Sequence, residues 1–531
     1  MDEHSKRIWH GALLLTIAMF IVKILSVVYR IPYQNITGDT GFYVFQQVYP
    51  FYGIASTFAL AGFPVALSRV LSERSDNLGD TERGTIIQSG FTAFFAAGLL
   101  LFLVLFLGSA KIAFWMGDPG LQVPIQATSF IYLTVPIVAV FRGIFQGCEQ
   151  MKQTAVSQVT EQSVRVACII GFSYYFISHG YNVYMAGAGA SIGSVAGSLA
   201  GLLVLAIYFY RSENRKKGWT IGLKPSIQTG FQLLSAGILL SISSMILLLF
   251  QLADAFTFVN LLRQNGMDPA EARSLKGIFD RAQPLLQLGT VIATSVSLAA
   301  VPAVAAAKMH MDYGRIQKTC GISIKAVFII GLAAAAGLAV IIEPVNRMLF
   351  ESTEGSLEIA VLGISILTVS LFLVSTGLLQ GLGCSTVPVM SVSASFIAKI
   401  TGNFVLMPLW GSLGASFATV LASVAAAAIN LVILERKTAF AAAGKFHGIR
   451  IGGAAAVMSL AAWLIKSGLD QVLAESRISD AVISIAASAG GGIALLAALT
   501  TAKVIEAEEL VSILRLQKLQ HVLKRWTERR S

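Results

Sequence analysis

The residues of this sequence that could do chemistry are a few charged side chains inside long apolar segments. Lys23 and Arg30 lie two helical turns apart in the first such segment, so both project from one face of a helix. An ionisable side chain at bilayer depth costs about 2.5 to 3.5 kcal/mol, and those that persist usually face a cavity or a partner. Fixed cations in a low dielectric favour an anion, most simply a phosphate or diphosphate, which Arg holds in bidentate fashion and Lys attracts as a point charge.

Three further charges extend this prediction to other segments. Asp254 lies in the seventh apolar segment, and Asp280 and Arg281 open the eighth. Together with Lys23 and Arg30 they predict a substrate cavity of mixed charge with a cationic excess. The alternative is that the arginines lie near helix ends and reach the aqueous interface, without any role in substrate binding.

Four more charged residues are secondary candidates. Glu161 and Arg165 are four residues apart, so they can pair on one helix face, and we interpret them as a structural pair that holds helices together. Lys325 and Lys399 belong to the ninth and eleventh segments. Lys325 can also reach the interface by extending its chain along the helix.

An aromatic and amide-rich stretch opens the second segment. Flat apolar faces with hydrogen-bonding tips suit sugars, but the aromatic belts at membrane surfaces have the same composition, and the usual enrichment of Tyr there favours the belt. The stretch contains Tyr43, Phe45, Gln46, Gln47, Tyr49, Phe51 and Tyr52.

Patterns that carry catalysis or metal binding are missing from the sequence. It has no Walker loop and no GxSxG, its four cysteines form no CxxC pair, and its six histidines have no ligand spacing. We therefore predict that the protein is not an enzyme and needs no cofactor or metal. Any work that it does must draw on a gradient of Na⁺ or H⁺, on the membrane potential or on the substrate's own gradient.

The composition requires a membrane as solvent. Of 531 residues, 55% are hydrophobic and only 13% are charged, and the mean hydropathy is +0.73, which excludes an ordinary water-soluble enzyme. Since roughly 20 apolar residues cross a bilayer, breaks at Pro, Gly, Asn and charges predict an all-α polytopic protein of about 14 transmembrane helices. The predicted helices start near Ile8, Gly41, Gly84, Gln122, Thr154, Val183, Gly230, Gly277, Thr319, Leu357, Val387, Leu413, Gly448 and Ala481.

The distribution of basic residues predicts the topology. Most Lys and Arg residues of the connecting segments fall on the side of the N-terminus, which places both termini in the cytoplasm. The net charge of +11 is spread over separate short loops, so it indicates topology and attraction to anionic lipids rather than a nucleic-acid partner. Leu516 to Trp526, at helical spacing among basic residues, predicts an amphipathic helix on the cytoplasmic leaflet.

Short motifs recur in the same order in the second half of the chain. GIFQG at 143–147 returns as GLLQG at 377–381, GAS at 189–191 returns at 414–416, and AGFP returns as AAVP. Because six helices separate the copies, we predict two parallel six-helix repeats that form a two-lobed V-shaped transporter, with two extra C-terminal helices. The predicted parts are an N-lobe at 1–217, a C-lobe at 218–440, helices 13 and 14 at 441–503, and a basic tail at 504–531.

Three stretches carry a resemblance to a known family: VKILS at 22–26 with Arg30, GFPVALSR at 62–69, and IFDRAQPL at 278–285. They resemble the polysaccharide-biosynthesis branch of the multidrug/oligosaccharidyl-lipid/polysaccharide (MOP) exporter superfamily, in particular its stage V sporulation protein B and MurJ-like lipid II flippase group. The resemblance implies that an undecaprenyl-diphosphate-linked saccharide moves between the leaflets of the cell membrane. Its cavity arginines fall on Lys23, Arg30 and Arg281, and Lys23 keeps the charge but loses the guanidinium fork.

Two other functions stay open at this point. The related MATE branch consists of cation-coupled multidrug exporters, which Asp254 suits, although Lys23 and Arg30 are unsuited to cationic drugs. A scaffold that recruits cell-wall enzymes is the second. The partners expected for the flippase are the lipid-linked saccharide, membrane lipids and enzymes of cell-wall or polysaccharide synthesis.

Overall fold

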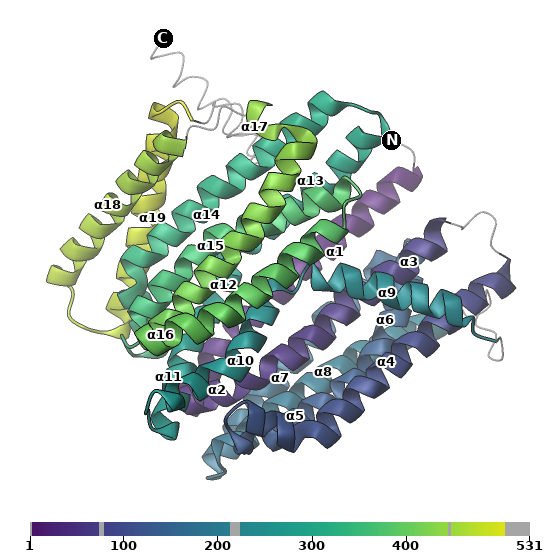
Figure 1. Ribbon diagram of the computed structural model, residues 1–531, viewed down its shortest axis with the longest axis horizontal. Coiled ribbons are helices and arrows are strands. Elements are labelled where there is room, and N and C mark those ends of the chain that lie inside the picture. The colour runs from purple at the N-terminus through teal and green to yellow at the C-terminus, as the bar shows by residue number, and fades with distance from the viewer. Residues whose placement is uncertain (1–2, 74–78, 213–223, 444–447, 505–531) are drawn as a thin grey trace. The chain divides into compact units, whose positions relative to one another are not determined.

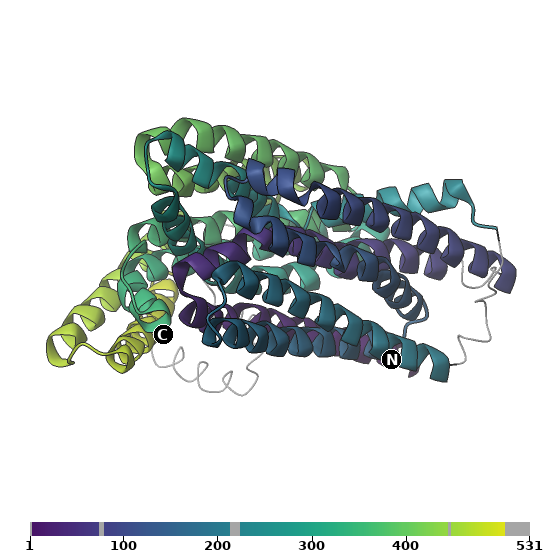
Figure 2. The ribbon, with the colours of Figure 1, turned by 90° about the horizontal axis from the view of Figure 1, so that it is seen from below.

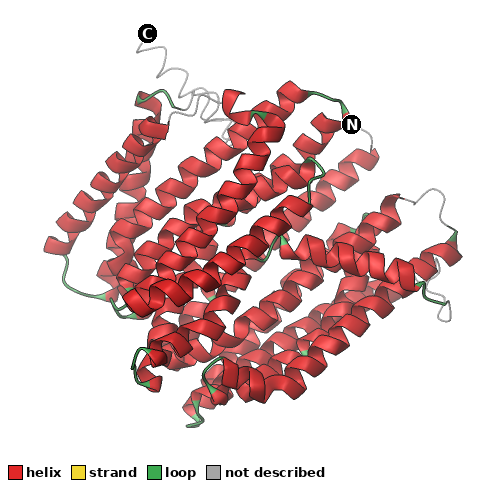
Figure 3. Cartoon of the chain, in the orientation of Figure 1, coloured by secondary structure: helices red, strands yellow, loops and turns green. Residues whose placement is uncertain are grey.

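Helices make up all the regular structure that the computed structural model describes, which is residues 3–73, 79–212, 224–443 and 448–504 (Figures 1 and 3). Within these residues, 11 helical stretches are long and apolar enough to cross a membrane. The predicted class, an all-α multi-pass membrane protein, is therefore confirmed. The number of 14 helices stays a prediction, and the amphipathic helix expected at Leu516 to Trp526 lies outside the described residues.

Two long helices contain a sharp break at a glycine. Helix α2 (Arg30–Thr57) is interrupted at Gly38, where φ is 68°, and α16 (Thr386–Thr438) at Gly411, where φ is 55°. This left-handed backbone region carries a steric penalty for residues with a Cβ atom. The predicted helix starts near Gly41 and Leu413 follow these breaks by a few residues, so each break divides a long helix into two consecutive helical segments.

The chain divides into two compact units. The first holds residues 1–291 and 382–430, and the second holds residues 292–381 and 431–531. Besides α2 and most of α16, the first contains α1 (Glu3–Val28), η1 (Phe58–Gly62), α3 (Phe63–Glu73), α4 (Asp80–Trp115), η2 (Pro119–Leu121), α5 (Gln122–Ser129), α6 (Ile131–Gly147), α7 (Met151–Ser178), α8 (Val183–Arg211), α9 (Ile227–Ile242), α10 (Ile246–Gln264), α11 (Pro269–Asp280) and α12 (Ala282–Gly289).

Small residues bring α7 and α8 of the first unit into close contact, and the two helices run side by side in both views (Figures 1 and 2). Gly189, Gly193, Gly197 and Gly201 recur at four-residue spacing along α8. A Cβ atom at Gly197 would lie 2.6 Å from the carbonyl oxygen of Glu161. The glycines therefore let the two backbones approach, as small residues do between membrane helices.

The second unit is built around a long helix, α14 (Tyr313–Phe350), which packs on α15 (Ser356–Gly381) and on the pair α18 and α19. Lys325 lies in α14. Ion pairs tie α14 to the C-terminal pair, since Lys466 of α18 contacts Glu343 at 2.9 Å. The remaining helices of this unit are α13 (Val291–Met309), α17 (Phe440–Ala443), α18 (Gly448–Val472) and α19 (Arg477–Thr501).

Candidate functional site

Arg30 occupies an unusual position at the start of α2. Its side chain is fully buried, with 0% of its surface exposed, and its guanidinium carbon lies 4.3 Å from the centre of the Tyr49 ring. Nε, Nη1 and Nη2 have no hydrogen-bond partner among the described residues. A buried donor without a partner costs about 1 to 3 kcal/mol, and more when it is charged. Arg30 is thus a buried cation with all its donors unused.

The break at Gly38 explains how Arg30 meets Tyr49. Beyond Gly38 the chain folds back, so residues 39–57 of α2 pack against the residues before the break. The Tyr33 ring lies 4.8 Å from the Phe45 ring, and the Tyr29 ring lies 6.0 Å from it. These ring contacts fix the two pieces of α2 against each other. They place Arg30 over Tyr49, the aromatic residue that follows Phe45 one helical turn later.

The aromatic stretch of α2 does not form a belt on the lipid surface. Of its seven aromatic and amide residues, six are buried and Tyr49 is half-buried. The stretch packs on α7, α8 and α10, where the Gln47 amide donates to the Ala255 carbonyl at 3.1 Å. The belt interpretation is therefore wrong here, because these side chains face the inside of the first unit.

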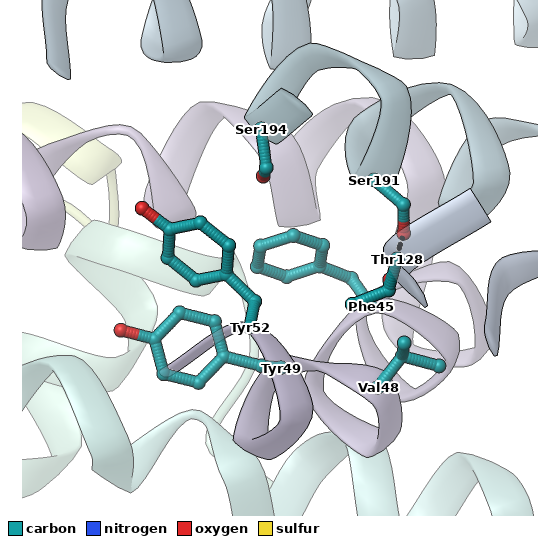
Figure 4. Close-up of a pocket in the computed structure, with 7 residues that line it drawn as sticks. All are labelled: Phe45, Val48, Tyr49, Tyr52, Thr128, Ser191 and Ser194. Atoms are coloured by element: carbon teal, nitrogen blue, oxygen red, sulfur yellow. Dashed lines mark hydrogen bonds between the residues drawn. The ribbon is translucent and has the colours of Figure 1, made fainter. Parts of the chain in front are cut away.

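A small pocket with room for about one water molecule lies beside this stretch (Figure 4). Tyr49 and Tyr52 lie next to each other with their hydroxyl groups pointing the same way, and the Ser194 hydroxyl points toward the rings. Its lining combines aromatic faces with hydroxyl groups, the composition expected for sugars, in a space smaller than a sugar ring. It is lined by Phe45, Val48, Tyr49, Tyr52, Thr128, Ser191 and Ser194.

Arg165 lies at the other end of the same aromatic group, but its donors are used. Its guanidinium carbon is 3.9 Å from the centre of the Tyr52 ring. It donates to the Tyr29 hydroxyl at 3.0 Å, to the Ser194 hydroxyl at 3.2 Å and to the amide oxygen of Gln162 at 3.3 Å. Arg165 therefore joins α7 to α8 and α2 as a structural anchor.

Glu161 has a different partner from the one that its spacing predicts. Its carboxylate accepts from Arg142 of α6 at 2.7 Å, rather than pairing with Arg165 along its own helix. Arg142 also donates to the Ser157 hydroxyl at 3.3 Å. Glu161 therefore still joins helices through an ion pair, but the pair connects α6 and α7.

Asp254 and Lys399 neutralise each other in the interior. Their ion pair, between α10 and α16, measures 2.6 Å, and both side chains are almost completely buried. The Lys399 ammonium also donates to the amide oxygen of Asn403 and to the Ala415 carbonyl, each at 3.0 Å. Asn403 in turn donates to Asp254 at 2.8 Å and to the Thr257 hydroxyl at 2.7 Å. This network leaves little charge for a substrate.

The two remaining candidates are also paired, through residues that the sequence did not single out. Asp280 contacts Lys276 at 2.5 Å, and Arg281 contacts Asp39 at 2.6 Å. Lys276 is 2% exposed. Its i,i+4 spacing to Asp280 is the signal that could have identified the pair.

The structure brings four of the nine predicted charged residues into one group with Lys276: Arg30, Asp254, Asp280 and Lys399. Asp280 interacts electrostatically with Asp254 and Arg30, and Lys399 with Lys276 and Asp280. Three cations and two carboxylates make up this group, which leaves one positive charge in excess. Lys23 lies partly buried in α1, and Lys325 belongs to the second unit.

The sequence matches the polysaccharide biosynthesis protein family over residues 8–310. This chain belongs to that family. It is 38% identical to uncharacterized membrane protein YabM of Bacillus subtilis (strain 168), across 98% of this chain and 97% of the relative. Identity to lipid II flippase MurJ of the same organism is 26%, across 82% of this chain and 84% of MurJ. The resemblance read from the sequence is thereby confirmed.

Solved structures share the fold of this family member. Lipid II flippase MurJ in an inward closed conformation aligns with a TM-score of 0.66 at 13% identity, across 92% of this chain and 98% of MurJ. An inward-facing multidrug resistance MATE family transporter of the MOP superfamily aligns with 0.65 at 16% identity, across 81% and 98%. The protein is therefore a multi-pass membrane protein with the fold of MOP transporters, and its family contains transporters rather than enzymes.

Proposed function

We propose that this family member is a flippase that moves an undecaprenyl-diphosphate-linked saccharide across the cytoplasmic membrane by alternating access. The observation that carries the proposal is Arg30, whose buried guanidinium has no hydrogen-bond partner among the described residues. A diphosphate presents paired oxygens that match the guanidinium fork and supplies the missing negative charge. Binding such a group would remove the cost of burying these N–H donors without acceptors.

Two further observations support this substrate class. The charge group around Asp280 has a cationic excess, which suits an anion rather than a cationic drug. The lining of the small pocket beside Tyr49 has the aromatic faces and hydroxyl groups that suit a sugar. One relative, MurJ, is by its name a flippase for lipid II.

The remaining parts of the proposal concern orientation, energy and partners. Both termini lie in the cytoplasm, as the distribution of basic residues indicates. A gradient of Na⁺ or H⁺, or the membrane potential, drives the movement, and no organic cofactor takes part. The partners are membrane lipids and the enzymes that make or use the lipid-linked saccharide.

The experiment measures binding of undecaprenyl diphosphate to the purified full-length protein by native mass spectrometry. We expect the parent to prefer this lipid to phosphatidylglycerol, and Arg30→Ala to weaken its binding about 30-fold, as expected for a lost charge-assisted pair. The double variant Lys23→Ala/Arg30→Ala tests the contribution of Lys23. Lys111→Ala, which removes an exposed cation of α4, is the matched control. Equal affinity of the parent for both lipids would contradict the proposal.

The alternative function, drug export, rested on Asp254. Asp254 is the carboxylate that a cationic drug would need, and it is already paired with Lys399 inside a closed hydrogen-bond network. Overexpression should therefore leave resistance to ethidium-type dyes unchanged. A scaffold without transport activity would behave as wild type after Arg30→Ala, and would respond instead to deletion of loops or tail.

A further inference from the structure

We propose that Tyr49 is the positioning residue of Arg30: its ring holds the guanidinium by one face and leaves the N–H donors available to an anion. The inference rests on the proposed function for the identity of that anion. The distance of 4.3 Å from the guanidinium carbon to the ring centre lies well within the range of a cation–π contact.

The other buried cations of this region show what is different about Arg30. Carboxylates hold Arg281 at 2.6 Å, Lys276 at 2.5 Å and Lys399 at 2.6 Å. A carboxylate fixes a cation, but it also cancels the charge and uses the donors. An aromatic face fixes the cation through its quadrupole and accepts none of the in-plane N–H groups of a planar guanidinium. Tyr49 therefore orients Arg30 without neutralising it.

The ring of Tyr49 is itself held in place. The Tyr52 ring lies 5.9 Å from it along the same helix, and the Arg165 guanidinium covers Tyr52 at 3.9 Å. Hydrogen bonds anchor Arg165 to Ser194 and to the hydroxyl of Tyr29, the residue that precedes Arg30. One end of this row of rings is thus an arginine whose three nitrogens all donate hydrogen bonds to the scaffold, and the other end is an arginine without hydrogen-bond partners among the described residues.

The arrangement assigns Tyr49 a measurable part in anion affinity. Loss of the ring leaves Arg30 charged but free to change rotamer, so ordering it again opposes binding. From the usual strength of a desolvated cation–π contact, we expect Tyr49→Leu to weaken undecaprenyl diphosphate binding about 5- to 30-fold. Tyr49→Phe keeps the ring and should stay within about twofold of the parent.

A double-mutant cycle separates positioning from general packing. If Tyr49 acts through Arg30, Tyr49→Leu weakens undecaprenyl diphosphate binding in the parent and has no further effect in Arg30→Ala. Phe94→Leu is the matched control, because it removes a fully buried ring of the same unit, one that lies in α4 and stacks on Phe63 at 4.2 Å. This control should leave the affinity of the folded protein within about twofold of the parent.

Ring electronics test the same contact in a protein of unchanged shape. In a Tyr49→Phe series, successive fluorine atoms withdraw electron density from the ring face, so affinity for undecaprenyl diphosphate should fall stepwise with their number. This series replaces Tyr49→Leu if that variant does not fold. A flat series, or an equal loss from Tyr49→Leu with and without Arg30, would overturn the positioning role alone. Unchanged binding in Arg30→Ala would overturn the proposed function, and the role of Tyr49 with it.

Discussion

Two buried cations of the first unit are held in opposite ways. Lys399 has a carboxylate, an amide oxygen and a backbone carbonyl as partners, so its ammonium is satisfied inside α16 and α10. Arg30 has the face of Tyr49 and no hydrogen-bond partner among the described residues. Since both are fully buried, exposure alone does not separate structural from functional charges. The difference lies in the partners: a completed network stabilises the fold, whereas unused donors are available to a ligand.

The largest expected effect comes from breaking the completed network. Asp254→Ala leaves the Lys399 ammonium buried without its carboxylate, which should lower the free energy of unfolding by about 3 to 5 kcal/mol. Replacing both residues, Asp254→Ala with Lys399→Met, removes the stranded charge and should recover most of the loss. Unfolding of the purified protein in detergent measures both variants. If the double variant were as unstable as Asp254→Ala, the pair would not be the unit that stabilises this region.

A second effect tests how closely α2 and α11 approach beside the site. Gly277 faces the backbone of Asp39, and a Cβ atom at this glycine would overlap the Asp39 carbonyl oxygen. Gly277→Ala should therefore push the helices apart, weaken the Arg281–Asp39 pair and lower the free energy of unfolding by about 1 to 3 kcal/mol. In Gly171→Ala, where no atom lies within 4 Å of the added Cβ, stability should stay equal or rise. Equal stability of the two variants would contradict the close approach.

The fold was largely predictable because it depends on local patterns. Apolar length and glycine breaks identify membrane helices, and the predicted starts near Gly41 and Leu413 follow the observed breaks at Gly38 and Gly411. The same reasoning found Arg30, since a charge in an apolar segment stands out.

Partners across helices were not predictable, because a single sequence contains only along-helix spacing. Glu161 therefore received the wrong partner, while Asp39 and Lys276 were not singled out. The aromatic stretch of α2 was misread for a related reason. A lipid-facing belt and a buried aromatic stack have the same composition, and only packing on α7, α8 and α10 distinguishes them.

Arg30→Gln tests the buried cation that has no hydrogen-bond partner, for which we expect little change in stability. Because Arg30 forms no hydrogen bond with the described residues, replacing it should change the free energy of unfolding by less than about 1 kcal/mol, or raise it, while binding of undecaprenyl diphosphate weakens about 30-fold. Thermal unfolding with and without the lipid measures both parts: the lipid should stabilise the parent more than the variant. A loss of stability as large as that of Asp254→Ala would mean that Arg30 is a structural cation after all.

The smallest expected loss of stability comes from an ion pair of the second unit, and it serves as a reference for the two buried cations compared above. Lys466 and Glu343 form an ion pair of 2.9 Å in the second unit, but the Glu343 side chain is 56% exposed. Solvent screens such a pair and both chains lose freedom when it forms, so Lys466→Ala should lower the free energy of unfolding by less than about 1 kcal/mol. This pair is nearly as short as the pair between Asp254 and Lys399, which measures 2.6 Å. If Lys466→Ala lowers the free energy of unfolding much less than Asp254→Ala under the same conditions, then burial and the surrounding hydrogen bonds, rather than distance, make the interior network strong. Equal effects of Lys466→Ala and Asp254→Ala would remove the physical basis for contrasting Lys399 with Arg30.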